Sequence, residues 1–334
     1  MTYAPFKAAC VQAAPAYFDL DGGVKKTIAL INEAADAGAK LIAFPECWIP
    51  GYPWWAWLDA PAVGMQYVQR HFANCMTADG NEVQQIAQAA IARGIYTVLG
   101  YSERKDGSLF IGQIHIDPWT RTITPRRKLK ATHTERTIFG EGDGSDFFVR
   151  DTPLGRIGAL CCWEHLNPLN KHAMFAQNEQ IHIGAWPGFS LYAGKAFALG
   201  PELNTAVSQV YAAEGQCFVL AATTLVTQEI QDLICDTGFK QELLPIGGGT
   251  ARIFGPDGSP LADALAEDAE GLIYADIDLS MISLAKAAAD PTGHYSRADV
   301  FYLVANRTRR SAMVETQAPS APRDIAIVDE AERD

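Results

Sequence analysis

The stretch Gly158-Ala-Leu-Cys-Cys-Trp-Glu-His165 decides how this chain is interpreted, because an apolar run turns abruptly polar and aromatic within it. The apolar residues predict a strand over Arg156–Cys162 that ends at the Trp163-Glu-His turn. An α/β enzyme can present a nucleophile at such a strand end, where nearby charge controls the thiolate fraction. Side chains alternate along a strand, so only one of Cys161 and Cys162 can face a given pocket. Two inert packing thiols are the alternative, but the polar turn after Cys162 favours an exposed thiol beside free backbone N–H groups.

Two other segments could supply the charged partners of a thiolate. Glu46 comes directly after Leu41-Ile-Ala-Phe-Pro45, so it lies just past the end of a predicted strand. Lys128 lies within the basic run Arg126-Arg-Lys-Leu-Lys130. A solvated loop carboxylate and a basic surface are the simpler interpretations of these two residues taken alone. Strand alternation would place Lys128 and Lys130 on the same side, so spacing does not distinguish them.

Apolar runs recur along the chain with helical patterns between them, which favours a layered α/β domain. A hairpin-like pair across Lys105-Asp-Gly107 adds antiparallel pairing, so we expect a mixed sheet. The predicted strands are Phe6–Gln12, Lys40–Pro45, Tyr96–Ser102, Leu109–Asp117, Arg156–Cys162, Ile181–Trp186, Cys217–Thr223, Thr250–Phe254 and Leu272–Ile277. The predicted helices are Val24–Ala37, Glu82–Ala92, Leu203–Ala213 and Met281–Ala289.

Composition narrows the class of protein. The chain has 334 residues, a formal net charge of −12 and 48% hydrophobic residues, as in an ordinary globular protein. The negative charge argues against nonspecific binding to nucleic acid or to an anionic membrane surface. No apolar stretch is long enough for a membrane span, and no signal peptide is visible at the N-terminus. Seven cysteines without framework spacing predict free thiols in a reducing cytoplasm, and scattered histidines without a Cys-x-x-Cys pair argue against a structural metal site.

Three ordered segments resemble the signature motifs of the nitrilase superfamily. They are Phe44-Pro-Glu46, Arg127-Lys-Leu-Lys-Ala-Thr-His-Thr-Glu-Arg136 and Cys162-Trp-Glu-His165. The resemblance extends from Phe6 to about Val304 and implies a four-layer α-β-β-α sandwich with mixed sheets. It implies a catalytic domain over residues 1–306. From about Arg307 the composition turns polar, which predicts a tail over residues 307–334 that is mobile or contacts other subunits. Ala131 departs from the family pattern, which usually has proline there.

The resemblance also implies the roles of four residues. Cys162 would be the nucleophile, Glu46 the general base and later acid, and Lys128 the cation that stabilises developing negative charge with the Trp163 backbone N–H. Glu135 would hold Lys128 or assist proton transfer, although a salt bridge to Arg136 or Lys130 is the alternative for it. The reaction needs neither a metal nor an organic cofactor.

Details of the motifs indicate the branch and the substrate. The Trp-Glu-His after Cys162 and the segment Thr132-His-Thr-Glu-Arg136 resemble true nitrilases, and the closest resemblance is to bacterial arylacetonitrilases. Tryptophans follow Pro53 and flank the nucleophile, which suggests an apolar pocket for an aryl or arylalkyl nitrile, although core packing must account for some of them. The expected substrate-binding residues are Tyr52, Trp57, Trp163, His165 and Trp186.

Other functions remain open at this point. An amidase or carbamoylase could use the same Glu-Lys-Cys set, and a non-enzymatic assembly protein is a third possibility because the family forms spiral oligomers. An intact set of reactive residues argues against the scaffold. We expect a cytoplasmic homo-oligomer, at least a dimer and in the larger case a spiral, that acts on a small nitrile and water.

Overall fold

The computed structural model describes residues 3–311 of the chain, in which eleven strands form one hydrogen-bonded sheet. Most of the strands are largely buried, as expected for apolar runs covered on both faces, whereas the two strands at the edges of the sheet are only partly buried. The strands are β1 (Phe6–Ala13), β2 (Ala39–Ala43), β3 (Tyr96–Lys105), β4 (Ser108–Asp117), β5 (Thr122–Arg127), β6 (Val149–Thr152), β7 (Gly155–Cys161), β8 (Ile181–Trp186), β9 (Phe218–Thr224), β10 (Arg252–Phe254) and β11 (Gly271–Ile277).

The sheet is mixed and consists of two halves that meet at β1 and β9. Its order is β5-β4-β3-β2-β1-β9-β8-β7-β6, with β11 beside β1 and β10 beside β9. The neighbouring pairs β3-β2, β2-β1, β1-β9, β9-β8 and β8-β7 are parallel. The hairpins β3-β4, β4-β5 and β6-β7 are antiparallel. Only Gln12–Ala13 of β1 pair with β9, so the halves join at one end and diverge beyond it.

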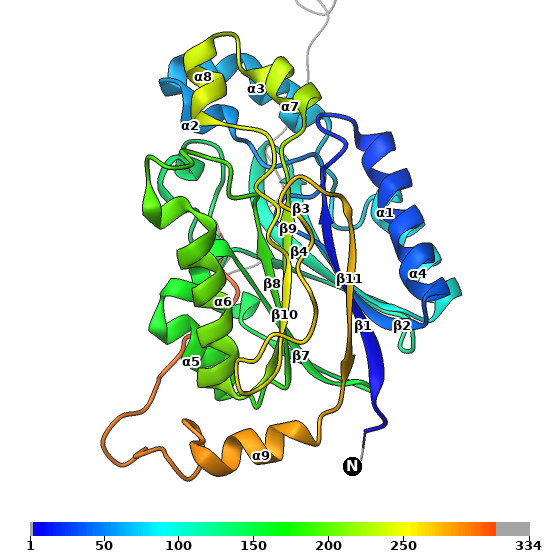
Figure 1. The fold of residues 1–334 in the computed structure, drawn as a ribbon, viewed down its shortest axis with the longest axis vertical. Coiled ribbons are helices and arrows are strands. Elements are labelled where there is room, and N and C mark those ends of the chain that lie inside the picture. The colour runs from blue at the N-terminus through cyan, green and yellow to red at the C-terminus, as the bar shows by residue number, and fades with distance from the viewer. Residues whose placement is uncertain (1–2, 312–334) are drawn as a thin grey trace, which may run out of the picture.

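Helices cover the outer faces of both halves (Figure 1). On one side α1 (Leu20–Asp36) and α4 (Asn81–Arg93) pack on β1–β4, and on the other α5 (Pro168–Phe175) and α6 (Pro201–Gly215) pack on β7–β9. A third apolar cluster lies between the halves and combines residues of β1–β3 with residues of β7–β9. The predicted four-layer α-β-β-α sandwich is therefore confirmed, with its two β layers belonging to one curled sheet.

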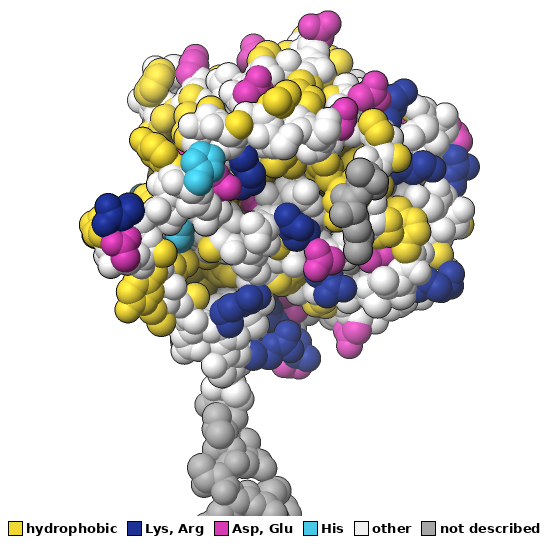
Figure 2. Space-filling model, turned by 90° about the horizontal axis from the view of Figure 1, so that it is seen from below, with side chains coloured by type: hydrophobic (Ala, Val, Ile, Leu, Met, Phe, Trp, Pro, Cys, Tyr) yellow, Lys and Arg dark blue, Asp and Glu magenta, His cyan; other side chains and the backbone are white. Residues whose placement is uncertain are grey.

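The remaining helices gather at the two ends of the sandwich. Those at one end are α2 (Trp55–Leu58), α3 (Pro61–Ala73), α7 (Gln228–Ile234) and α8 (Gly238–Leu243), whereas α9 (Met281–Ala288) lies at the other (Figure 1). Seen from the α9 end, basic and acidic side chains lie interspersed among apolar ones (Figure 2). Within residues 3–311, no helix is long and apolar enough to cross a membrane.

The predicted elements are present, with ends that differ by a few residues. The hairpin across Lys105-Asp-Gly107 is confirmed by the antiparallel pairing of β3 with β4. The sequence prediction missed the edge strands β5 and β6 and the helices α2, α3, α5, α7 and α8. Most of the predicted tail, residues 312–334, lies outside the described part of the chain.

Candidate active site

The first component of the site is a sharp turn at the end of β7. The strand ends at Cys161, and Cys162 begins a 3-10 helix, Cys162–Leu166, with a φ of +45°. Left-handed backbone is uncommon for residues other than glycine, and such strained turns cluster at functional sites. Cys161 is fully buried within the core, whereas Cys162 lines a cavity. The turn therefore separates the two thiols and presents only Cys162 to the cavity.

A buried lysine lies beside this turn. The ammonium of Lys128 donates to Glu46 Oε1 at 2.9 Å and to Glu135 Oε2 at 2.9 Å. All three side chains are 1% exposed or less. The neighbouring Lys130 is 59% exposed and pairs with the surface residue Glu141. Because β5 ends at Arg127, strand alternation does not extend to these lysines, and the structure places only Lys128 inside.

Glu46 keeps one carboxylate oxygen free. It follows the end of β2, and its backbone N–H donates to the carbonyl of Trp186 at the end of β8, 3.2 Å away. Oε1 is bound by Lys128, whereas Oε2 is buried without a hydrogen-bond partner among the described residues. Buried polar atoms are normally paired, so an orphaned carboxylate oxygen marks a place where a reacting group can bind. Glu46 can thus accept a proton there.

Glu135 is held more firmly than Glu46. It belongs to the 3-10 helix His133–Thr137, and its Oε2 also accepts from the Thr132 backbone N–H at 2.6 Å. Its Oε1 accepts from the Tyr52 hydroxyl at 2.6 Å, and that hydroxyl accepts from Trp57 Nε1 at 3.1 Å. The expected alternatives for Glu135, an ion pair with Arg136 or Lys130, are not formed; its partner is Lys128. Glu135 therefore connects the lysine to the wall of the cavity.

The charges of the site shift one another's ionisation. Burial raises the pKa of Glu46; the Lys128 charge opposes this rise, and Glu135 adds to it. Burial alone would lower the pKa of Lys128, but Glu135 and Glu46 raise it overall, so the ammonium stays charged. Burial and then Glu46 raise the pKa of the Cys162 thiol, while Lys128 and the Trp163 backbone N–H lower it. The resting thiol is accordingly protonated and needs a base, which Glu46 can provide.

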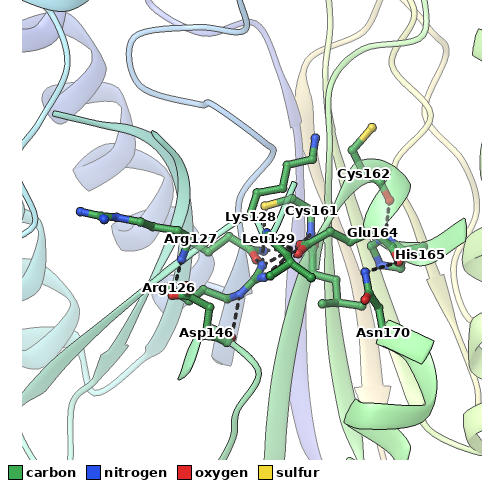
Figure 3. A network of polar contacts seen from close by, with 12 residues as sticks. Arg126, Arg127, Lys128, Leu129, Asp146, Cys161, Cys162, Glu164, His165 and Asn170 are labelled. Carbon is green, nitrogen blue, oxygen red and sulfur yellow. Dashed lines mark hydrogen bonds and ion pairs between the residues drawn. The ribbon is translucent and has the colours of Figure 1, made fainter. Parts of the chain in front are cut away.

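A second buried ion pair braces these elements (Figure 3). Both terminal nitrogens of Arg126 donate to the Glu164 carboxylate at 2.9–3.0 Å. The same carboxylate accepts from the Leu129 N–H at 2.9 Å and from the Cys161 N–H at 2.8 Å. Glu164 thus ties the segment that carries Lys128 to the turn that carries Cys162. The sequence prediction assigned no role to Glu164, since a polar turn residue gives no sign of a buried arginine partner.

The cavity in front of Cys162 is mainly aromatic and aliphatic. Of the expected substrate-binding residues, Tyr52, Trp57 and Trp163 line it, and Asn204 Oδ1 holds the Trp163 indole N–H at 2.9 Å. The prediction missed several other lining residues, among them Phe189 from the loop after β8, Leu199 from a 3-10 helix and Asn204 from α6. The full lining is Tyr52, Trp54, Trp57, Thr132, Glu135, Cys162, Trp163, Pro187, Gly188, Phe189, Leu191, Leu199 and Asn204.

Two of the expected substrate-binding residues lie elsewhere. His165 is 1% exposed, and its Nδ1 lies 2.5 Å from the Cys162 carbonyl oxygen, on the side away from the cavity. Trp186 is also 1% exposed and stacks on His165 with ring centroids 4.9 Å apart. Neither lines the cavity. His165 is turned toward the Cys162 carbonyl, and Trp186, at the end of β8, packs on its ring, so direct substrate contact by either residue stays a prediction that the cavity lining does not support.

Comparisons with known proteins agree with this geometry. The chain belongs to the carbon-nitrogen hydrolase family, whose model matches residues 7–287. It is 58% identical over 311 residues to a nitrilase of Pseudomonas syringae, covering 93% of each chain. It is 50% identical to an arylacetone-specific nitrilase of Alcaligenes faecalis, covering 96% of this chain and 90% of that one, and 49% identical to an aliphatic nitrilase of Rhodococcus rhodochrous, covering 93% and 85%. The resemblance to the nitrilase superfamily is confirmed.

Solved structures support the fold. The NitFhit protein of Caenorhabditis elegans superposes with a TM-score of 0.69 at 18% identity, covering 93% of this chain and 70% of that one. Nit3 of Saccharomyces cerevisiae, a member of branch 10 of the nitrilase superfamily, gives 0.68 at 18% identity, covering 88% and 97%. At these identities the likeness concerns the fold alone.

Proposed function

We propose that this chain is a nitrilase that hydrolyses an organic nitrile to the carboxylic acid and ammonia, with Cys162 as its nucleophile. One observation carries the proposal: a buried lysine joins two buried carboxylates beside a cysteine at a strained strand end. The names of full-length relatives at 49–58% identity support nitriles as substrates. Glu46, Lys128, Glu135 and Cys162 are the residues to which we assign the chemistry.

The first half of the reaction makes a thioimidate. Glu46 takes the thiol proton on its free oxygen while the sulfur of Cys162 attacks the nitrile carbon. A C–S bond forms, one C–N π bond breaks, and the nitrile nitrogen receives the proton from Glu46. The Lys128 ammonium and the Trp163 N–H stabilise the negative charge that develops during attack.

The second half consumes two waters. Glu46 removes a proton from the first water, which attacks the thioimidate carbon, and passes that proton to the nitrogen. The nitrogen then takes the hydroxyl proton of the adduct as the C–N bond breaks, which releases ammonia and leaves a thioester. The second water attacks the thioester, the C–S bond breaks, and the thiol regains its proton. The balance is one nitrile and two waters converted to one acid and one ammonia. Glu135 keeps Lys128 in place throughout.

The lining of the cavity supports an aryl or arylalkyl nitrile. Aromatic faces and leucines make up most of the lining, and a few polar side chains, among them Glu135, Thr132 and Asn204, complete it. The relatives include both arylacetone-specific and aliphatic nitrilases, so the cavity rather than the comparison carries this part of the proposal.

A paired substrate assay tests the reaction. Ammonia and acid release would be measured from a nitrile and from the matching amide under identical conditions. The proposal expects turnover of the nitrile with a clearly higher kcat/KM than the amide. Turnover of the amide with an inert nitrile would instead assign the same residues to an amidase.

We also propose that the enzyme works as a homo-oligomer in a reducing cytoplasm. Apolar side chains on and near α5 and α6 are exposed, with Leu169 63% and Phe197 72% exposed, as expected for a face covered by another subunit. All seven cysteines are free and buried, which suits a reducing compartment. We keep residues 307–334 as a tail outside the catalytic domain that modulates assembly size. Light scattering that gave a monomer at assay concentration would refute the oligomer.

A further inference from the structure

Behind the nucleophile runs a buried chain of hydrogen bonds that the reaction just described does not use. His165 Nδ1 lies 2.5 Å from the Cys162 carbonyl oxygen, and His165 Nε2 lies 2.8 Å from His182 Nε2 (Figure 3 shows the first of these contacts). His182 Nδ1 lies 2.8 Å from Glu179 Oε1, and the Tyr211 hydroxyl donates to Glu179 Oε2 at 2.6 Å. The chain thus connects α6 and β8 to the turn that carries Cys162.

The residues of this hydrogen-bond chain are buried, and glycines beside them leave the space that their side chains need. Glu179, His182, His165 and Tyr211 are at most 2% exposed. A side chain on Gly158 of β7 would clash with Glu179 Oε1, and one on Gly184 of β8 would come within 3.3 Å of His165 Nε2. Glycine at both positions lets the polar side chains pass through the packed layer between β7, β8 and α6.

The chemistry of the acceptors fixes where each proton lies. The Cys162 carbonyl can only accept, so His165 carries its proton on Nδ1 and presents a lone pair at Nε2. His182 must then donate from Nε2 and accept at Nδ1, which requires a proton between that nitrogen and Glu179. Tyr211 donates into the far end. If one proton is lost from the Glu179–His182 pair, either the contact between the two imidazoles or the contact to the Cys162 carbonyl has no hydrogen.

We propose that Glu179 and His182 are positioning residues of the nucleophile: through His165 they hold the Cys162 carbonyl and so fix the left-handed turn. That turn sets the direction of the thiol and of the Trp163 N–H together. The inference rests on the proposed role of Cys162. A misplacement of about 1 Å at a reacting centre can cost on the order of a hundredfold in rate. Loss of these hydrogen bonds should therefore lower turnover.

The ionisation of the chain agrees with this arrangement. Burial raises the pKa of Glu179 to about 8, against the Tyr211 hydrogen bond, which lowers it. Burial also lowers the pKa of His182 and of His165 and raises that of Tyr211 and of the adjacent Cys217. At neutral pH the carboxyl group is therefore protonated and the groups facing it are uncharged. Glu179 then donates to His182, and the chain is complete.

Two substitutions at Glu179 test the proposal. In Glu179→Gln the amide N–H can donate to His182 and the amide oxygen can accept from Tyr211, so the pattern of a protonated carboxyl is preserved. Glu179→Met has similar length and offers neither. We expect Glu179→Gln to keep kcat within about threefold of wild type, and Glu179→Met to lower kcat by about tenfold or more with KM within about threefold. Circular dichroism and thermal melting establish that both are folded.

The outcomes separate this proposal from the proposed function. Wild-type kcat should fall as pH rises past the pKa of Glu179, and Glu179→Gln, which cannot ionise, should lack that fall. Unchanged kcat in folded Glu179→Met, or equal losses in the Met and Gln variants, would overturn the positioning role. If Glu179→Met does not fold, the pH profiles of wild type and Glu179→Gln decide, and identical alkaline limbs contradict the proposal. Absence of nitrile turnover in the wild type would instead refute the proposed function.

Discussion

Arg126 and Glu164 form a bidentate ion pair in the interior, with side chains 1% and 2% exposed, and this pair joins the strand before Lys128 to the turn that carries Cys162. Removing one member of a buried pair leaves an uncompensated charge, which costs far more than the pair itself contributes. The geometry of the catalytic groups therefore depends on two residues that do not take part in the chemistry.

Glu164→Ala should lower the free energy of unfolding by about 3–5 kcal/mol, because Arg126 would remain buried without a partner. Urea denaturation followed by circular dichroism measures this change. Glu141→Ala is the matched control, since the Lys130–Glu141 pair is on the surface, and it should change the free energy of unfolding far less. Equal effects of the two substitutions would contradict the bracing role of the Arg126–Glu164 pair.

Lys128→Ala should lower kcat/KM by several orders of magnitude, because Lys128 both stabilises developing charge and joins two buried carboxylates. Lys130→Ala, two residues away and exposed, should change it by less than about threefold. Initial rates of ammonia release give both values. An equal loss in both variants would remove the basis for assigning the buried lysine.

The pH dependence of kcat/KM should show an acid limb well above the usual glutamate pKa of 4.5, since burial raises the pKa of Glu46. Glu46 accepts the thiol proton only as a carboxylate, so activity rises as pH increases through its raised pKa and is lost below it. Glu135→Gln removes a charge that raises this pKa, so the limb should move to lower pH. A wild-type limb at pH 4–5 would show that Glu46 is not the titrating base.

Phenylacetonitrile should be hydrolysed with higher kcat/KM than propionitrile, because the lining of the cavity is aromatic. Phe189→Ala should lower kcat/KM for phenylacetonitrile by about tenfold and should affect propionitrile much less. Ammonia release from phenylacetonitrile, benzonitrile and propionitrile provides the comparison. A preference for propionitrile would refute the aromatic pocket and leave the catalytic residues unaffected.

Most of the fold could be predicted because its central strands are continuous apolar runs. β8 was predicted with its exact ends, Ile181–Trp186, since every residue in it is buried. β5 was missed because Thr122–Arg127 is a polar edge strand that contains Pro125, which is the pattern of a loop. Helices α2, α7 and α8 at the end of the sandwich have 4, 7 and 6 residues, too few turns to give a clear period.

Sequence motifs could identify the candidate catalytic residues of the site. They could not predict the side-chain directions that the local backbone conformation sets. Alternation along the predicted strand indicated that only one of Cys161 and Cys162 could face a pocket, but the turn with a positive φ at Cys162, where His165 binds the Cys162 carbonyl, leaves no sign in the sequence. Trp186 was expected in the cavity because it ends a strand near the nucleophile, whereas Phe189 and Leu199, from a loop and a short 3-10 helix, line the cavity instead.

The central claim is that Cys162 attacks the nitrile, and turnover of Cys162→Ala beside Cys161→Ala tests it most directly. Acid and ammonia release from phenylacetonitrile would be measured for both variants, with circular dichroism as the check on folding. The predicted result is no detectable turnover in folded Cys162→Ala and activity close to wild type in Cys161→Ala, whose thiol is buried in the core away from the cavity. Turnover retained in Cys162→Ala and lost in Cys161→Ala would contradict the account.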